Sequence, residues 1–262
     1  MAAKPKTPAV PAVPAEAPRG KAQLPVNYAA QLAAEAAAIS KQIAAPGGDR
    51  IRYNGNASFK TPDGMEGEAL EVVIVNFVST NLYYDTPYDR GNPLPAACFA
   101  INAEPKLLTP SPNSPNIQAD NCNVCPQNQF GSNGKGKACS NTRLLAVISS
   151  AALEDVDNVA DIWIMSVPPT SLKFFDAYVA SLSAKHKTVP VGVITQVYLD
   201  SKNTYASPRF EVVRPLTDSE LGVFMSRREE AMTRLQAEPD TSGYVAPKAA
   251  NNRVVPPRGA RR

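Results

Sequence analysis

Histidine is almost absent from this chain: His186 is the single one among 262 residues, accompanied by only four cysteines and one tryptophan. No Ser/His/Asp or Cys/His pattern typical of nucleophilic catalysis is present. There is no run of about 18 apolar residues, so we expect no membrane-spanning helix and no membrane partner. The N-terminus is interrupted by prolines and lacks a continuous apolar stretch, so we expect no secretory signal. The sequence therefore predicts a non-enzymatic protein of the cytoplasm, where cysteines stay reduced.

Acidic residues are missing from one end of the chain and scarce at the other. The segment 245–262 carries five basic residues and no acid, and residues 1–21 carry four basic residues against Glu16 alone. Proline recurs in both segments, which favours extended, unpacked chain. We expect basic disordered tails over residues 1–26 and 239–262. Such tails suit an acidic polymer, and they serve solubility and tethering equally well.

The remainder predicts an alanine-rich helix over residues 27–48 and a strand-rich body over 49–238. Strands are expected near residues 51–60, 70–78, 96–102, 144–149, 161–167, 189–199 and 209–213. Ser171 begins one helix, and the capping box at Thr217–Glu220 begins another that runs to about Ala237. A helix ahead of a terminal strand pair is typical of an OB-type barrel. The predicted fold class is mostly β (α+β): an elaborated OB-like antiparallel barrel with a zinc-binding insertion, a C-terminal helix and disordered tails. Another mixed antiparallel α+β domain fits the same order.

The four cysteines are the most informative residues. Cys122 and Cys125 form a C-x2-C pair in a segment rich in Asn, Gly, Pro and Ser, with Cys139 downstream and Cys98 upstream. A C-x2-C turn brings two thiolates to one tetrahedral ion, and the other two complete a four-sulfur set. We therefore expect a zinc loop over residues 98–141, with a structural ion because no ligand position is left open for water.

Three alternatives remain at these cysteines. Four thiolates also hold an iron–sulfur cluster, and spacing does not separate the two. The cysteines could instead form disulfides or stay free thiols. Cys98 lies in the apolar run A-A-C-F-A-I, so it could be a small core residue. His186 follows a helix in a lysine-flanked segment and is expected on the surface rather than as a ligand.

The segment G-S-N-G-K-G-K-A at residues 131–138 nearly matches a phosphate-binding loop. A phosphate loop leaves a buried strand and enters a helix, whereas polar residues precede Gly131. Ala138 also replaces the hydroxyl that would bind magnesium. We expect a flexible basic loop that faces solvent or a phosphate backbone.

Exposed aromatics beside basic side chains are what stacking on unpaired bases requires. Tyrosines and an arginine gather in the polar stretch 81–90, and Phe130 lies in the cysteine loop. The candidate base-stacking residues are Tyr83, Tyr84, Tyr88 and Phe130, and the candidate phosphate contacts are Arg90, Lys135, Lys137 and Arg143. The alternative is a set of tyrosines half-buried at a strand end.

A nuclease site that binds a hard metal ion is a further possible function of this sequence. Asp155, Asp157 and Asp161 are close in sequence, between two expected strands. A solvated turn explains the same residues.

The run C-N-V-C-P-Q-N-Q-F-G-S-N-G-K-G-K-A-C is similar to a cysteine-and-glycine signature of bacteriophage-encoded proteins. With the strand-rich body, it resembles the zinc-containing OB-fold single-stranded-DNA-binding proteins of large tailed phages. The likeness covers mainly residues 96–145, and the chain differs in having no histidine near the cysteines and in ending basic rather than acidic.

This resemblance implies a non-enzymatic single-stranded nucleic-acid-binding protein of phage DNA replication or recombination, acting in the host cytoplasm. Its partners would be single-stranded DNA, or RNA, together with replication or recombination proteins. The alternative is a structural or protein-interaction protein that uses its zinc-stabilised loop as a contact platform. A metal-dependent nuclease or an iron–sulfur protein comes third.

Overall fold

The computed structural model describes residues 48–86, 94–153 and 161–247, which all belong to one compact unit spanning residues 47–262. The expected tail 1–26, nearly all of the expected helix 27–48, and the end of the basic tail from residue 248 lie outside the described residues. Within the described part of the chain, no helix has the length and apolarity that crossing a membrane requires.

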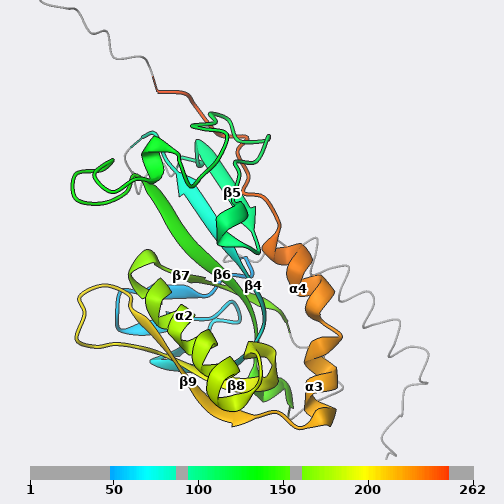
Figure 1. Ribbon diagram of the computed structural model, residues 1–262. Helices are drawn as coiled ribbons and strands as arrows, with labels where there is room; N and C mark the ends of the chain where they lie inside the picture. The colour runs from blue at the N-terminus through cyan, green and yellow to red at the C-terminus, as the bar shows by residue number, and fades with distance from the viewer. Residues whose placement is uncertain (1–47, 87–93, 154–160, 248–262) are drawn as a thin grey trace, which may run out of the picture. The chain divides into compact units, whose positions relative to one another are not determined.

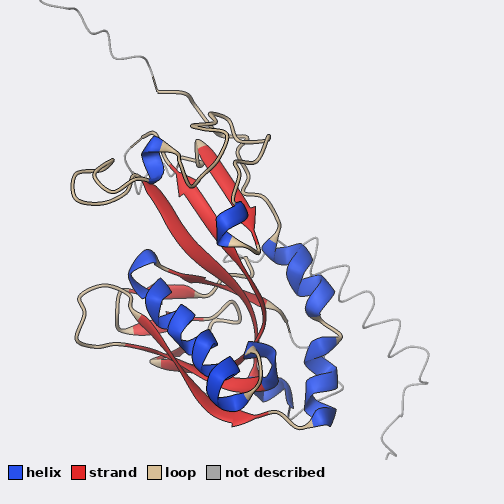
Figure 2. Ribbon diagram, in the orientation of Figure 1, coloured by secondary structure: helices blue, strands red, loops and turns tan. Residues whose placement is uncertain are grey.

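One antiparallel sheet of six strands dominates the described chain (Figures 1 and 2). Its strands are β4 (Ala69–Tyr83), β5 (Cys98–Asn102), β6 (Cys139–Ser149), β7 (Trp163–Val167), β8 (Val193–Leu199) and β9 (Pro208–Pro215). The order is β7-β6-β4-β8-β9. β6 pairs along one edge of β4, while β8 pairs with Ala69–Val72 and β5 with Ser79–Tyr83 on the other edge. Over Ser79–Tyr83, β4 therefore lies between β5 and β6.

A smaller antiparallel sheet precedes the main one. It consists of β1 (Arg52–Asn54), β2 (Ser58–Lys60) and β3 (Glu66–Gly67). The expected strand 51–60 is thus two strands, because the chain turns at Gly55, whose φ of +60° suits glycine. Just before β1, the Ile51 N–H donates to the Ile164 carbonyl, so this segment lies along the outer edge of β7.

Both faces of the main sheet are covered by helices (Figure 1). On one face, α2 (Leu172–Ser181) packs over Phe77, Leu145 and Phe210, with Phe175 fully buried between them. On the other face, α3 (Asp218–Met225) and α4 (Arg228–Leu235) bury Phe224 and Leu235 against Val73 and Val78. The short helical turns are η1 (Pro105–Leu107), η2 (Pro126–Asn128), η3 (Ser150–Leu153), η4 (Pro169–Ser171), η5 (Leu182–His186) and η6 (Pro190–Gly192). The sheet is the middle layer of a three-layer arrangement.

The prediction of a mostly β, antiparallel protein with a few helices is confirmed, but the expected barrel is wrong. The sheet is open and runs from β7 to β9. The physical reason lies in β4, where Val72, Val73, Ile74 and Val75 are all buried in succession. Side chains alternate between the two faces of a strand, so such a run needs cover on both faces, which helices supply.

The C-terminal helix also differs in detail from the expectation. The capping box is present: the Glu220 N–H donates to the Thr217 hydroxyl, and the Thr217 N–H donates to the Glu220 carboxylate. The helix is divided into α3 and α4, because the chain departs from the regular α-helix at Ser226 and Arg227. Together the two pieces cover the length of the sheet face.

Candidate metal centre

Three neighbouring strands place two cysteines on the same face of the sheet. Tyr83, at the end of β4, is paired with Cys98 of β5 on one side and with Cys139 of β6 on the other. Directly paired residues of antiparallel strands project from the same face. Cys98 and Cys139 therefore face the same side, one strand apart on either side of Tyr83.

The connection between β5 and β6 returns the other two cysteines to that face. The Cys122 N–H donates to the Leu108 carbonyl at 3.2 Å, and the Asn128 side chain donates to the Cys122 carbonyl at 2.7 Å. Cys125 directly precedes η2, whose first residue is Pro126, a residue preorganised for a helical start. Apolar packing contributes little to this region, since its core cluster consists of Ala100, Leu108 and Cys122 alone.

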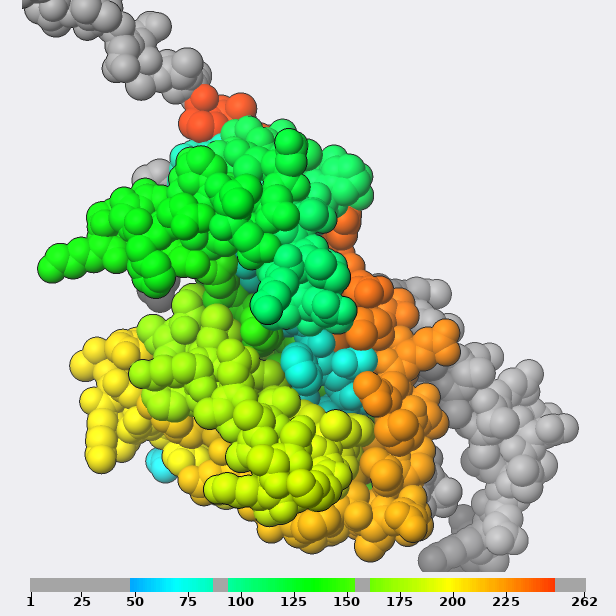
Figure 3. All heavy atoms as spheres, viewed as in Figure 1, coloured from blue at the N-terminus to red at the C-terminus, as the bar shows by residue number. Residues whose placement is uncertain are grey.

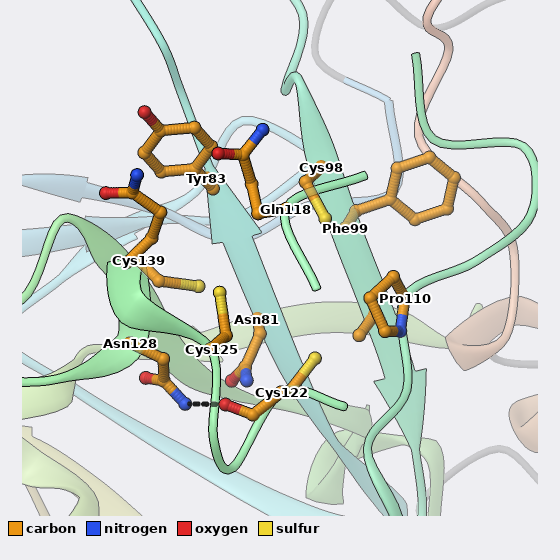
Figure 4. A pocket seen from close by; sticks show the side chains of 12 residues that line it. Asn81, Tyr83, Cys98, Phe99, Pro110, Gln118, Cys122, Cys125, Asn128 and Cys139 are labelled. Carbon is orange, nitrogen blue, oxygen red and sulfur yellow. Dashed lines mark hydrogen bonds between the residues drawn. The ribbon is translucent and has the colours of Figure 1, made fainter. Parts of the chain in front are cut away.

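All four cysteines are buried, unpaired as disulfides, and line one cavity of about 10 Å³. Figure 4 shows their sulfur atoms pointing into the shared space. That volume is close to the room taken by one water-sized sphere. The fold thus brings four cysteines that are spread over residues 98–139 to the lining of one small cavity.

The surroundings of the cavity raise the pKa of two of the four thiols, those of Cys139 and Cys122. Burial and the neighbouring cysteine charges raise the pKa of the Cys139 thiol to about 12, and the Lys137 ammonium opposes this rise. Burial also raises the pKa of Cys122, against the lowering effect of a hydrogen bond from Asn81. Thiolates bind metal and thiols do not, so binding would release protons and weaken as the pH falls.

A polar network behind the cysteines escaped the sequence analysis. Asn81, buried on β4, accepts a hydrogen bond from the Asn141 side chain at 2.6 Å and donates to Cys122. The Lys137 ammonium donates to Asn141 at 3.2 Å and to Asn128 at 3.3 Å. The network places one positive charge and one amide donor beside the sulfur atoms, as the outer partners of metal ligands commonly do. The sequence would have indicated this network only if the pairing of Asn81 with Asn141 on the neighbouring strand had been known.

The donor chemistry fits a thiophilic ion, but the side chains do not already form a closed ligand set. In residues 48–86, 94–153 and 161–247, no three or more His, Cys, Asp or Glu side chains are arranged so that they could hold a metal ion. Four sulfur atoms face one small space, and their final approach to one another would have to accompany binding. Zinc therefore stays a prediction.

The glycine-rich segment between Cys125 and Cys139 is a compact turn. Gly131 and Gly134 have φ of +95° and +61°, and the Gly131 N–H donates to the Gly136 carbonyl at 2.9 Å. Phe130 precedes this turn with 82% of its surface exposed, and the Lys137 ammonium lies 5.2 Å from its ring centroid. Lys135 is exposed at the tip. The segment follows the short helix η2 and enters strand β6, which is not the context of a phosphate-binding loop.

The remaining nucleic-acid candidates are spread over several environments. Tyr83 ends β4 and lines the cysteine cavity, whereas Tyr84 is 47% exposed. Arg143 lies on β6, with its side chain only 13% exposed and an ion pair to Asp176 at 3.6 Å. Tyr88 and Arg90 lie outside the described residues. Among the described candidates, the fold thus gathers Phe130, Lys135 and Lys137 on the cysteine loop, whereas Arg143 lies apart from them on β6.

The alternative hard-metal site is described only in part. Asp161 is exposed, and Asp155 and Asp157 lie outside the described residues. His186 is exposed at the end of η5, as expected.

Comparison with known proteins found no family model, no curated protein and no solved structure that matches this chain.

Proposed function

We propose that Cys98, Cys122, Cys125 and Cys139 bind one zinc ion, which holds the β5–β6 connection against the sheet. This proposal is supported by the burial of all four thiols around one cavity. It is also supported by the small apolar cluster in this region, which gives the segment little stabilisation from apolar packing. The ion would be structural, since four sulfur ligands leave no position for a substrate.

We further propose that the ordered connection binds single-stranded nucleic acid without catalysis. The observation that carries this is the 82% exposed Phe130 ring, with the Lys137 ammonium beside it and Lys135 at the adjacent tip. An exposed aromatic ring next to basic groups can stack on an unpaired base while the ammonium groups contact phosphates. A place in phage DNA replication or recombination rests on the resemblance of the cysteine segment alone.

Fluorescence anisotropy with a labelled unpaired oligonucleotide tests this function. We expect binding at low salt that weakens steeply at moderate salt, because phosphate contacts release counterions. Phe130→Ala should weaken binding by about 1–3 kcal/mol, roughly 5- to 150-fold. Leu107→Ala is the matched control, because Leu107 is another exposed apolar residue of the same connection. Absence of binding at low salt, or an equal loss in both variants, would contradict the proposal.

Protein contact is the second candidate, and exposed apolar side chains of the same connection favour it. Leu107, Ile117 and Val124 are 56%, 48% and 74% exposed. The weak overall charge of +3 also suits a protein partner better than a strongly anionic polymer. Capture of a specific partner that persists after nuclease treatment, together with no oligonucleotide binding, would select this function over the first.

A further inference from the structure

A second cavity lies below the cysteine cavity on the same face of the sheet. It has a volume of about 270 Å³ and lies between α2 and the start of the β5–β6 connection. Figure 3 shows the surface hollowed there, between the green atoms of the connection and the yellow-green atoms of α2. Phe77, Pro105 and Val179 provide apolar walls, and Arg143, Asp176 and Ser183 provide the polar groups.

Arg143 is poorly satisfied in this position. Its side chain is 13% exposed, yet within the described residues its ion pair is a long one, to Asp176 at 3.6 Å, and the Asp176 side chain is 58% exposed. Charge-assisted hydrogen bonds are shorter, about 2.7–2.9 Å, and a guanidinium offers five donors. The cavity therefore presents a cation with unused hydrogen-bonding capacity.

A buried hydroxyl next to Arg143 also has unused hydrogen-bonding capacity. Ser79 is paired across the strands with Arg143, and its hydroxyl is buried without a hydrogen-bond partner in the described part of the chain. Ser79 is also paired with Asn102 on β5. The Ser79 hydroxyl thus lacks the partner that a buried polar group normally has, and it lies beside a guanidinium whose ion pair is long.

We propose that the Arg143 cavity binds an oxyanion, and that its natural ligand is a phosphate group. Guanidinium groups recognise phosphate by paired N–H···O bonds, which Asp176 at its present distance does not supply. At about 270 Å³ the cavity lies just below the usual volume range of ligand pockets, and it has room for a phosphate and part of an attached group. The apolar walls would lie against that group.

Asp176 acts in this proposal as a competitor for the guanidinium. Among the described residues that line the cavity, its carboxylate is the one acidic group, and its exposed side chain can turn toward solvent when an oxyanion arrives. If the proposed function holds, the phosphate would belong to a bound nucleic-acid strand; otherwise it would be free phosphate.

The test is a titration of inorganic phosphate into the full chain, followed by the NMR signal of the Arg143 side-chain Nε–H group. We expect a saturable shift of that signal. Arg143→Gln should lower the phosphate affinity at least tenfold, and Asp176→Asn should raise it severalfold because the competing carboxylate is gone. Lys173→Gln is the control, since Lys173 is an exposed cation on α2, the helix that carries Asp176. Because Asp176→Asn alters an exposed side chain, it keeps the test decisive if Arg143→Gln fails to fold.

A second titration with an unpaired oligonucleotide separates this inference from the proposed function. Phosphate binding at Arg143 without oligonucleotide binding would uphold the oxyanion site and overturn the nucleic-acid function. Oligonucleotide binding that Arg143→Gln leaves unchanged, with an Arg143 signal that phosphate does not move, would overturn the oxyanion site alone. A phosphate affinity equal in the parent chain and in Arg143→Gln would also overturn it.

Discussion

Cys98 is the residue that separates a four-sulfur centre from a simple buried cysteine. It is 8% exposed and lines the same cavity as the other three, although its sequence context is apolar. A small core residue would tolerate alanine, whereas a ligand would not. Its role is therefore open to a direct test.

We predict that Cys98→Ala abolishes stoichiometric zinc binding. The parent chain should hold about one ion, and the variant a small fraction of that, because a three-sulfur set leaves the ion partly solvated. Elemental analysis of the purified proteins measures the difference. Val124→Ala, a change at the exposed position between the two loop cysteines, should keep the full zinc content. Full zinc in Cys98→Ala would assign Cys98 to the core.

At the scale of elements, the start of α3 combines a helix cap with an ion pair. The Glu220 carboxylate accepts from the Thr217 N–H at 2.7 Å and from the Arg214 guanidinium at 2.7 and 2.9 Å. The hydrogen bonds from Arg214 and then Thr217 lower the pKa of Glu220 from its ordinary 4.5 to about 2. This junction fixes where β9 ends and where the helical layer begins.

We predict that Glu220→Gln lowers the free energy of unfolding at neutral pH and loses that effect in acid. A lowered folded-state pKa stabilises the fold above the ordinary pKa, and this stabilisation disappears as the pH falls from about 4.5 to about 2. Urea unfolding of both proteins across that window measures the difference. Glu71→Gln, the same change at an exposed position of β4 away from the cap, is the matched control. Parallel curves for Glu220→Gln and the parent would contradict the prediction.

At the scale of the whole molecule, the described chain has two substantial apolar cores and one region with hardly any. The cores lie on the two faces of the sheet, whereas the cluster at the β5–β6 connection consists of Leu108 and Cys122 together with Ala100 of β5. Regions with few apolar contacts open at lower free energy than the core. The connection should therefore depend on bound metal more than the sheet does.

We predict that chelation exposes the connection to trypsin while the sheet stays folded. Cleavage after Lys106, Lys135 and Lys137 should accelerate at least tenfold, whereas Arg143, held within β6 by pairing with β4 and β7, should remain protected. Mass spectrometry of the fragments identifies the sites. Re-addition of zinc should restore resistance. Cleavage unchanged by chelation would show that the connection needs no ion.

The sequence was sufficient for most strands because β-branched runs carry that signal locally. The V-V-I-V run of β4 and the Thr217–Glu220 capping box both have the predicted structure. The barrel prediction was wrong because the V-V-I-V run indicates more than a strand. Consecutive buried residues on β4 require cover on both faces, and that indicates a layered sheet rather than a closed one.

The composition and spacing of the cysteines, by themselves, determined which residues could share a thiophilic ion, because ligand type and a C-x2-C turn are local properties. Only the tertiary structure decided that Cys98 and Cys139 flank Tyr83, that Asn81 and Lys137 lie behind the sulfur atoms, and that Arg143 faces a cavity. Each of these depends on strand register, which long-range pairing and packing fix and which short stretches of sequence do not encode.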